Sequence, residues 1–272
     1  MPIENDASLQ DGLIATAMAA GVAVMNVYRQ NFSVDEKADA SPVTEADRQA
    51  EEIILAELRK LAPGVPVIAE ESCCAGRIPA VHDEFFLVDP VDGTREFICR
   101  NGDFTVNIAL IRAGLPVLGI VYAPVHGCLF VGRLGHGAER LSIAHGVIEA
   151  RRPIHVAAPP EIPPRIICSR SHRTAETDHF IGRYPGASLV SAGSSLKFCL
   201  MAAGEADLYP RMGPTMQWDT AAGDAVLRAA GGLVSTVDGD PLVYGPRDVP
   251  GLMAYANPWF VARGSNQFAV MA

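Results

Sequence analysis

Two aspartates stand three positions apart where an apolar stretch of the chain ends. Residues 85–97 read FFLVDPVDGTREF, so Asp89 and Asp92 directly follow a strand-like run. The order Asp-Pro-Val-Asp is typical of a type I turn, which brings its end Cα atoms within about 7 Å of each other. Two carboxylates held that close repel each other unless a cation lies between them or one of them is protonated. The segment therefore indicates a divalent cation site, with an ordinary turn as the alternative.

Further acids in the chain favour the cation site over the ordinary turn. Glu70 and Glu71 end a short strand-like segment 19 positions before Asp89, and Asp219 opens an Ala-rich stretch that reads QWDTAAGDA. If the two strands end at the same sheet edge, the glutamates lie beside the aspartates. The alternative for Asp219 is a plain helix N-cap. Carboxylates and the Val91 carbonyl form an oxygen-only ligand set, which is typical of Mg²⁺ and unlike the His and Cys sets of zinc or copper.

Three segments, in the order EES, DPVDGT and WDTAAGDAVLRAAGG, resemble the inositol monophosphatase superfamily of magnesium-dependent, lithium-sensitive phosphatases. Within it, KADASPVTEAD, GSSLKFCL and LYPRMGPTMQWDTAAG are most similar to the CysQ type of 3'(2'),5'-bisphosphate nucleotidase. The resemblance extends from about residue 10 to residue 260. It implies an α/β fold layered as an αβαβα sandwich. It also implies hydrolysis of the 3'-phosphate of adenosine 3',5'-bisphosphate (PAP) to AMP and phosphate by metal-activated water.

The resemblance leaves alternatives open for the activity. The sulfated relative of PAP, PAPS, is a second candidate substrate of the same reaction. An inositol monophosphatase or a fructose-1,6-bisphosphatase-like enzyme with the same metal core is the main alternative. A non-catalytic, metal-dependent regulatory protein is a further one, but such a protein would be expected to lose the water-activating groups, and Asp47, Thr94 and Glu70 are all present.

The resemblance also assigns roles to individual residues. Two or three Mg²⁺ ions are implied, and the family's metal ligands correspond to Glu70, Asp89, the Val91 carbonyl, Asp92 and Asp219. The catalytic set corresponds to Asp47, Thr94 and Glu70, with Asp47 and Thr94 as the pair that orients and deprotonates the attacking water. This pairing makes chemical sense, because a threonine hydroxyl is a weak base unless a carboxylate accepts its proton.

Substrate binding is assigned in the same way to Lys37, Gly93, Thr94, His172, Ser194, Lys197, Arg211 and Asp219. The amides of Gly93 and Thr94 suit a phosphate, since successive backbone N–H groups form an anion pocket. Lys197 and Arg211, with the Ser194 hydroxyl, correspond to the groups that bind the second phosphate. His172 corresponds to a residue against the adenine ring, and Lys37 to a loop lysine near the metals.

The elements that must position these residues follow from periodicity and turn signals. Residues 8–30 and 44–61 are predicted to be helices, the second with the capping signal TEAD at its start. Three strand-like runs, 104–112, 116–122 and 128–133, predict an antiparallel meander. The proline-rich segment 157–164 is the predicted boundary, so that 1–158 forms an α+β part with the metal loop and 159–272 an α/β part that completes the pocket.

Composition limits the remaining possibilities. The chain has 272 residues, 49% of them hydrophobic, and a formal net charge of −9 without a basic cluster, which argues against a nucleic-acid partner. The longest apolar stretch, roughly 13–27, is expected to be a buried helix too short to span a bilayer. Six cysteines without CxxC spacing indicate reduced thiols in a cytoplasm. The expected partner is a small-molecule substrate. A homodimer and a peripheral location on the cytoplasmic face of the inner membrane stay open.

Overall fold

A seven-stranded sheet forms the centre of the N-terminal half in the computed structural model, which describes residues 6–36, 42–169, 173–248, 253–265 and 268. Its strands follow chain order across the sheet: β3 (Val67–Ala69), β4 (Glu84–Asp92), β5 (Thr105–Arg112), β6 (Leu115–Ala123), β7 (Cys128–Arg133), β8 (Gly137–Ala144) and β9 (Val147–Ile154). β3 pairs with β4 in parallel, and all later pairs are antiparallel. The predicted meander is therefore confirmed, and β8 and β9 extend it.

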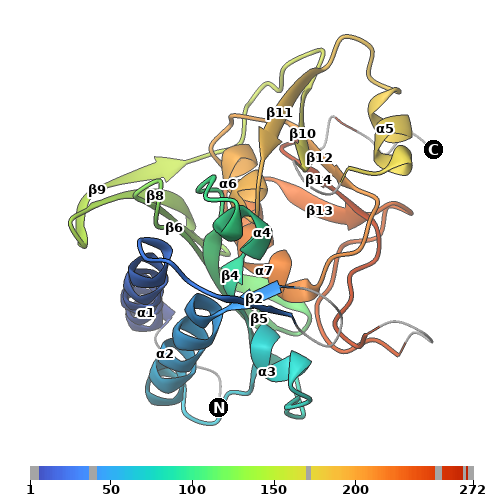
Figure 1. The fold of residues 1–272 in the computed structure, drawn as a ribbon. Coiled ribbons are helices and arrows are strands. Elements are labelled where there is room, and N and C mark those ends of the chain that lie inside the picture. The colour runs from blue at the N-terminus through green and yellow to red at the C-terminus, as the bar shows by residue number, and fades with distance from the viewer. Residues whose placement is uncertain (1–5, 37–41, 170–172, 249–252, 266–267, 269–272) are drawn as a thin grey trace.

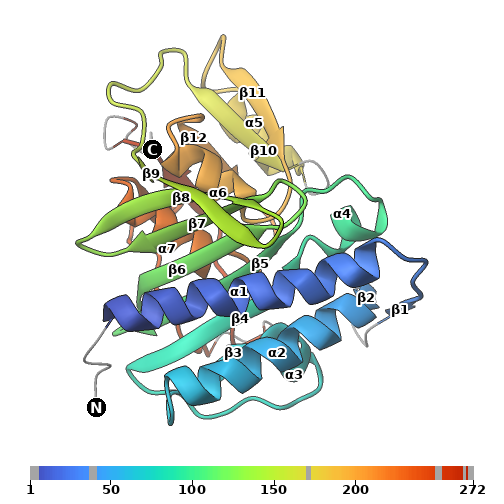
Figure 2. The same cartoon turned by 90° about the vertical axis from the view of Figure 1, so that its left-hand side faces the viewer.

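Two long helices cover one face of this sheet (Figures 1 and 2). Alternate residues of a strand point to opposite faces, so Phe86 and Val88 of β4 pack under the helices α1 (Asp6–Tyr28) and α2 (Glu45–Leu61). The side chains of Thr44 and Asp47 form a capping box that starts α2, as the TEAD signal predicts.

α1 is longer than its apolar stretch suggests. It has 23 residues, and by length and composition alone it could cross a membrane, a test that the buried core helix of a globular protein also meets. Its buried side chains, Leu13, Ala17, Ala20 and Val24, nevertheless belong to the same core cluster as Ile54 of α2. In this fold α1 is a packed layer of a globular domain.

Two short helices fill the space between this sheet and a second one. α6 (Leu196–Ala202) and α7 (Ala221–Ala229) share a core cluster with Phe85 and Leu87 from the other face of β4. α7 lies directly on the backbone of β6 and β7: a Cβ on Gly119 would come within 2.4 Å of the Ala222 carbonyl oxygen, and one on Gly132 within 2.4 Å of the Val226 Cα. Only glycine allows so close an approach of helix and sheet.

The second sheet has five strands in the order β11 (Ser188–Ala192), β10 (Arg165–Ser169), β12 (Leu208–Arg211), β14 (Phe260–Arg263) and β13 (Leu233–Thr236). α5 (Ala175–Ile181) covers its outer face, where Phe180 packs with Ile166 and Leu208. The layers thus alternate helix, sheet, helix, sheet, helix (Figure 1), which confirms the predicted αβαβα sandwich. The division proposed near residue 158 falls in the connection from β9 to β10.

Candidate active site

A cavity of about 250 Å³ lies where the end of β4 meets α6, β12 and the segment before α7. Among the residues lining it are ten of those predicted for metal or substrate binding: Glu70, Asp89, Val91, Asp92, Gly93, Thr94, Ser194, Lys197, Arg211 and Asp219. The structure therefore brings together groups that lie up to 149 positions apart in the chain (70 to 219). Two predicted residues, Lys37 and His172, lie outside the described residues.

The end of β4 differs from the predicted type I turn. Residues 89–92 remain part of the strand, and pairing with β5 shifts register between Asp89, opposite Asn107, and Asp92, opposite Thr105. From Asp89 to Asp92 the chain advances three residues in β4, while the paired strand β5 advances only two. This extra residue in β4 is a β-bulge. The Val91 amide donates to Asp89 Oδ1 at 3.0 Å, and this local bond holds the bulge. The expectation of a turn was wrong because Asp-Pro-Val-Asp suits a bulge as well as a turn.

Glu70 reaches the cavity because β3 runs parallel to β4. Ala69 pairs with Val88, so both strands end at the same sheet edge, as expected from the sequence. Glu70 then begins the short helix α3 (Glu70–Cys74) directly beyond β3. Gly93, at the end of β4, has φ +93° and precedes the short helix α4 (Thr94–Ile98). A side chain there would be strained, and its Cβ would lie 3.1 Å from the Asp103 carbonyl oxygen.

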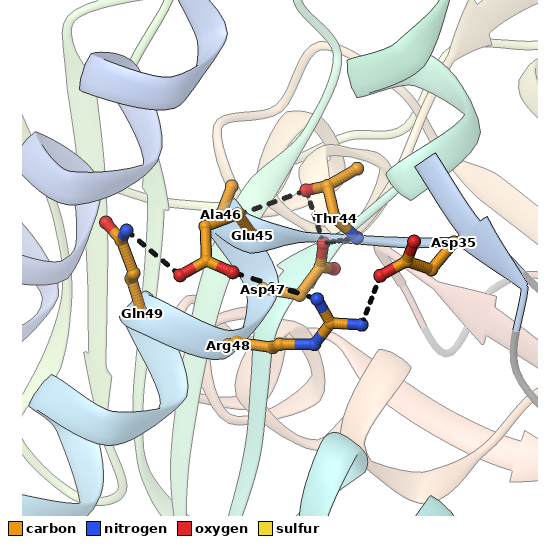
Figure 3. A network of polar contacts seen from close by, with 7 residues as sticks. All are labelled: Asp35, Thr44, Glu45, Ala46, Asp47, Arg48 and Gln49. Carbon is orange, nitrogen blue, oxygen red and sulfur yellow. Dashed lines mark hydrogen bonds and ion pairs between the residues drawn. The ribbon is translucent and has the colours of Figure 1, made fainter. Parts of the chain in front are cut away.

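Asp47 lies behind Thr94 and is buried at the start of α2. Its Oδ2 accepts hydrogen bonds from the Thr44 amide at 2.8 Å and from the Thr44 hydroxyl at 2.7 Å (Figure 3). Its Oδ1 is 3.3 Å from Thr94 Oγ1, which also lies 3.2 Å from the Val91 carbonyl oxygen. A hydroxyl has one proton. Thr94 can therefore donate to either acceptor and keep its lone pairs for a proton from another donor.

Asp219 does not form the plain helix N-cap that was the alternative interpretation of this residue. It ends a 3₁₀ turn, η1 (Gln217–Asp219), and its Oδ2 accepts a hydrogen bond from the Met216 amide at 2.9 Å. The residue before α7 is Thr220, whose side chain makes no capping bond. Asp219 therefore closes the turn that precedes α7 and does not cap the helix itself.

Two residues that the sequence reasoning missed connect the acids. Asn107 Nδ2 donates to Asp92 Oδ2 at 3.2 Å and to Ser195 Oγ at 2.9 Å, and Ser195 Oγ donates to the Asp219 carbonyl oxygen at 2.8 Å. This chain ties β4, β5, α6 and η1 around the cavity. A single asparagine inside the apolar run TVNIALI was the available sequence signal, since a buried amide requires partners.

The acids of the cavity disfavour one another's charge. Burial, and then the charges of Asp92 and Glu70, raise the pKa of Asp219 well above its ordinary value. Burial also raises the pKa of Asp92, although Lys197, Ser195 and Asn107 oppose the increase. A divalent cation would reverse both effects, and the donors are all oxygens, so the residues fit Mg²⁺ in charge and chemistry. This fit is one of charge and donor type and not of position: among the described residues, no three or more His, Cys, Asp or Glu side chains are grouped so that they could hold a metal ion in this structure.

Positive groups lie at the α6 and β12 side of the cavity. Lys197 is buried, its Nζ donates to the Ser194 carbonyl oxygen at 2.5 Å, and it lies 5.5 Å from the ring centroid of Tyr209. Burial lowers the pKa of Lys197, and Asp92 opposes this. Arg211 Nη2 donates to the Pro214 carbonyl oxygen at 2.5 Å. The Ser194 hydroxyl is buried without a hydrogen-bond partner among the described residues, which suits a ligand oxygen.

Asp224 is a buried acid that lies outside the cavity lining. It is buried in α7, where its carboxylate accepts hydrogen bonds from Arg228 Nε at 2.7 Å and from the Tyr244 hydroxyl at 3.0 Å. Arg228 Nη2 also donates to the Leu242 carbonyl oxygen at 3.0 Å. The group holds the segment 242–244 against α7 and is not part of the cavity lining.

Comparison with known proteins agrees with this geometry. Residues 5–259 match the model of the inositol monophosphatase family. The chain is 44% identical over 252 residues to the 3'(2'),5'-bisphosphate nucleotidase CysQ of Escherichia coli K12, covering 92% of this chain and 97% of that one. The CysQ protein of Salmonella typhimurium LT2 is 43% identical over 90% of this chain and 95% of its own length. The crystal structure of CysQ from Bacteroides thetaiotaomicron superposes with a TM-score of 0.77 at 38% identity, covering 94% of this chain and 97% of that one.

Proposed function

The chain belongs to the inositol monophosphatase family, and from this premise we propose that it is a 3'(2'),5'-bisphosphate nucleotidase that converts PAP to AMP and phosphate. The observation that carries the proposal is that one cavity is lined both by carboxylates, from β4 and the segments that follow β3 and precede α7, and by cations from α6 and β12; we call these two parts of the lining the acidic end and the cationic end. Glu70, Asp92 and Asp219 line the first, and Lys197 and Arg211 line the second. A substrate with two phosphates can use both ends, whereas a monophosphate needs only one.

The acidic end is proposed to hold Mg²⁺ through Glu70, Asp89, the Val91 carbonyl, Asp92 and Asp219, which all line the cavity. When bound, Mg²⁺ supplies positive charge to the phosphate oxygens and acidifies water. The bulge in β4 serves this arrangement, because it leaves Val91 without a partner residue in β5 while Asp89 and Asp92 are both paired. Asn107 orients Asp92 through its amide.

Thr94 and Asp47 are proposed to prepare the attacking water. A water that donates to Thr94 Oγ1 loses its proton most easily when the threonine proton moves to Asp47 Oδ1, 3.3 Å away. Asp47 stays in place because Thr44 holds its other oxygen with two hydrogen bonds. The 3'-phosphate would lie against Gly93 and Thr94, which line the cavity.

The cationic end is proposed to bind the 5'-phosphate. Lys197 is a compact charge fixed by the Ser194 carbonyl and the Tyr209 ring, so it loses little conformational entropy when an anion binds. Ser194 has φ +45°, an uncommon conformation for a residue other than glycine. Strained residues of this kind cluster at ligand sites, and the Ser194 hydroxyl is well placed to donate to the same phosphate.

The proposal is tested by phosphate release from PAP, PAPS, inositol 1-phosphate and fructose 1,6-bisphosphate, with Mg²⁺ and with or without Li⁺. We expect the highest kcat/KM on PAP, dependence on Mg²⁺ and inhibition by Li⁺. A higher kcat/KM on inositol 1-phosphate or fructose 1,6-bisphosphate would replace the nucleotidase by a sugar or inositol phosphatase. All six cysteines are free thiols, and we propose that the enzyme acts in a reducing cytoplasm.

A further inference from the structure

The helix that begins with Glu70 has a cap from a distant part of the chain. Ala69, the residue before α3, has no side chain that could accept a hydrogen bond. Glu51 of α2 supplies the acceptor: its Oε2 accepts from the Glu71 amide at 2.8 Å, and its Oε1 accepts from the Ser72 hydroxyl at 2.6 Å. Both oxygens of one carboxylate thus bind the two residues that follow Glu70.

Glu51 is unusual for a glutamate because it is only 4% exposed. Its two bonding partners in α3 are neutral donors, and a buried carboxylate is costly unless hydrogen bonds compensate for lost water. A helix cap on the surface would serve α3 without that cost. The burial of a charged cap suggests that the position of α3 itself matters.

Glu51 also stands four residues after Asp47 on α2, and residues at this spacing lie on one face of a helix. One face of α2 therefore contacts Thr94 through Asp47 and α3 through Glu51. The first contact is made with the start of α4 and the second with the start of α3. In the chain, α3 precedes β4 and α4 follows it, and the end of β4 lines the cavity.

We propose that Glu51 is a positioning residue for cation binding: it fixes the backbone of α3 and thereby the direction from which the Glu70 carboxylate enters the cavity. The inference rests on the proposed function, in which Glu70 is a ligand of Mg²⁺. Residues that orient a metal ligand typically change metal affinity by about 10- to 100-fold when removed. Glu51 does not touch the substrate or the cation in this proposal.

The test measures Mn²⁺ binding to the substrate-free protein, from the loss of the free Mn²⁺ signal in electron paramagnetic resonance. Glu51→Ala is expected to raise the Kd of Mn²⁺ by about 10- to 100-fold. Glu51→Gln can still accept from the Glu71 amide and donate to Ser72, so we expect it to restore most of the affinity. Glu52→Ala, an exposed neighbour on the same helix, is the matched control and should bind as the wild type does.

A second control distinguishes a specific effect on Mn²⁺ binding from a general loss of stability when a helix cap is removed. Thr174 caps α5, on the far sheet, by accepting from the Thr177 amide, so Thr174→Ala should lower the melting temperature in EDTA without a change in Mn²⁺ affinity. A folded Glu51→Ala protein with the wild-type Kd overturns the inference. If that variant does not fold, Ser72→Ala, which removes the 2.6 Å bond to Glu51 together with a 3.4 Å bond from exposed Arg77, must weaken Mn²⁺ binding. An unchanged Kd again overturns the inference. Failure of the wild type to bind Mn²⁺ would instead overturn the proposed function.

Discussion

The hydroxyl of Thr94 lies 3.3 Å from the carboxylate of Asp47, although 47 positions separate the two residues in the chain. The contact joins the first turn of α2 to the start of α4, at the wall of the cavity. Asp47 serves both in the capping box of α2, through Oδ2, and as the partner of Thr94, through Oδ1.

Replacing Thr94 by valine keeps its shape and removes the hydroxyl. General base catalysis contributes about 10²- to 10⁴-fold, so we expect kcat on PAP to fall by that order with little change in KM. Thr94→Ser should keep most of the activity because it retains the hydroxyl. Steady-state kinetics of the two variants check this, and a Thr94→Val enzyme as fast as the wild type would remove Thr94 from the mechanism.

Asp219→Asn is expected to abolish Mg²⁺-dependent phosphate release. Because Asp92 and Glu70 disfavour the charge of Asp219, removing that charge should keep or raise the melting temperature in EDTA. The amide oxygen can still accept the bond from Met216. Differential scanning fluorimetry with EDTA and with Mg²⁺ measures both effects. Retained Mg²⁺-dependent turnover in this variant would contradict the ligand assignment. Asp92→Asn is expected to lose Mg²⁺-dependent phosphate release in the same way.

Lys197→Met tests the cationic end of the cavity. A hydrogen bond to a charged group contributes roughly 1.5–3 kcal/mol, which corresponds to about 10- to 100-fold in affinity. We therefore expect KM to rise by that factor for PAP and to change little for 3'-AMP, which lacks the second phosphate. Lys60→Met, at an exposed lysine of α2, is the control. Equal effects of Lys197→Met on both substrates would place Lys197 elsewhere.

The ion pair between Arg165 and Asp207 is expected to make the free energy of unfolding depend on pH. Asp207 is 1% exposed and accepts hydrogen bonds from the Arg165 amide, Nε and Nη2 at 2.9–3.0 Å. Burial alone would raise the pKa of Asp207, but these bonds outweigh it and lower the pKa below its ordinary value.

A lowered carboxyl pKa stabilises the fold above the unfolded pKa, about 3.9, and this contribution is lost as the pH falls through the folded pKa. Asp207→Asn should therefore lower the free energy of unfolding at pH 7 by about 1–3 kcal/mol. The difference from the wild type should shrink below about pH 4. Urea unfolding at several pH values measures it, with exposed Asp238→Asn as control. A difference that does not vary with pH would exclude this linkage.

The adjacent cysteines after Glu70 should differ in reactivity. Burial, and then neighbouring Cys74 and Glu51, raise the pKa of Cys73 to about 12, whereas Cys74 is exposed. The thiolate is the reactive form, so iodoacetamide at pH 8 should label Cys74 and exposed Cys99 and leave Cys73 unmodified. Peptide mapping by mass spectrometry checks this. Fast labelling of Cys73 in the folded protein would show that α3 opens.

Local signals predicted much of the fold. Helices expected at 8–30 and 44–61 are found at 6–28 and 45–61, because apolar spacing and the capping signal are properties of the segment itself. The hairpin partners β8 and β9 were not predicted. β9 is largely exposed and carries polar residues such as Arg151 and Arg152, so it lacks the apolar run that marked the neighbouring strands.

The residues of the site were likewise predicted only in part. Acids that end strands were recognisable by type and spacing, as Asp89 and Asp92 show. Asn107, Ser195 and Glu51 were not, because their significance lies in contacts across 15 to 88 positions of the chain. The bulge in β4 could not be predicted from the sequence either, because it is defined by the register of pairing between β4 and β5.

The two glycines beneath α7 set a limit on how this pocket can change. With helix backbone resting on strand backbone at Gly119 and Gly132, α7 cannot move closer to the sheet, so the wall that directly precedes it, Asp219 and Thr220, cannot be displaced in that direction to make room. Laboratory redesign for a bulkier phosphate ester, or divergence toward one over evolutionary time, would have to proceed through the rest of the cavity lining. Phe198 and Tyr209 are the aromatic side chains of that lining, from α6 and β12, and we expect a shorter side chain at either position to widen the cavity.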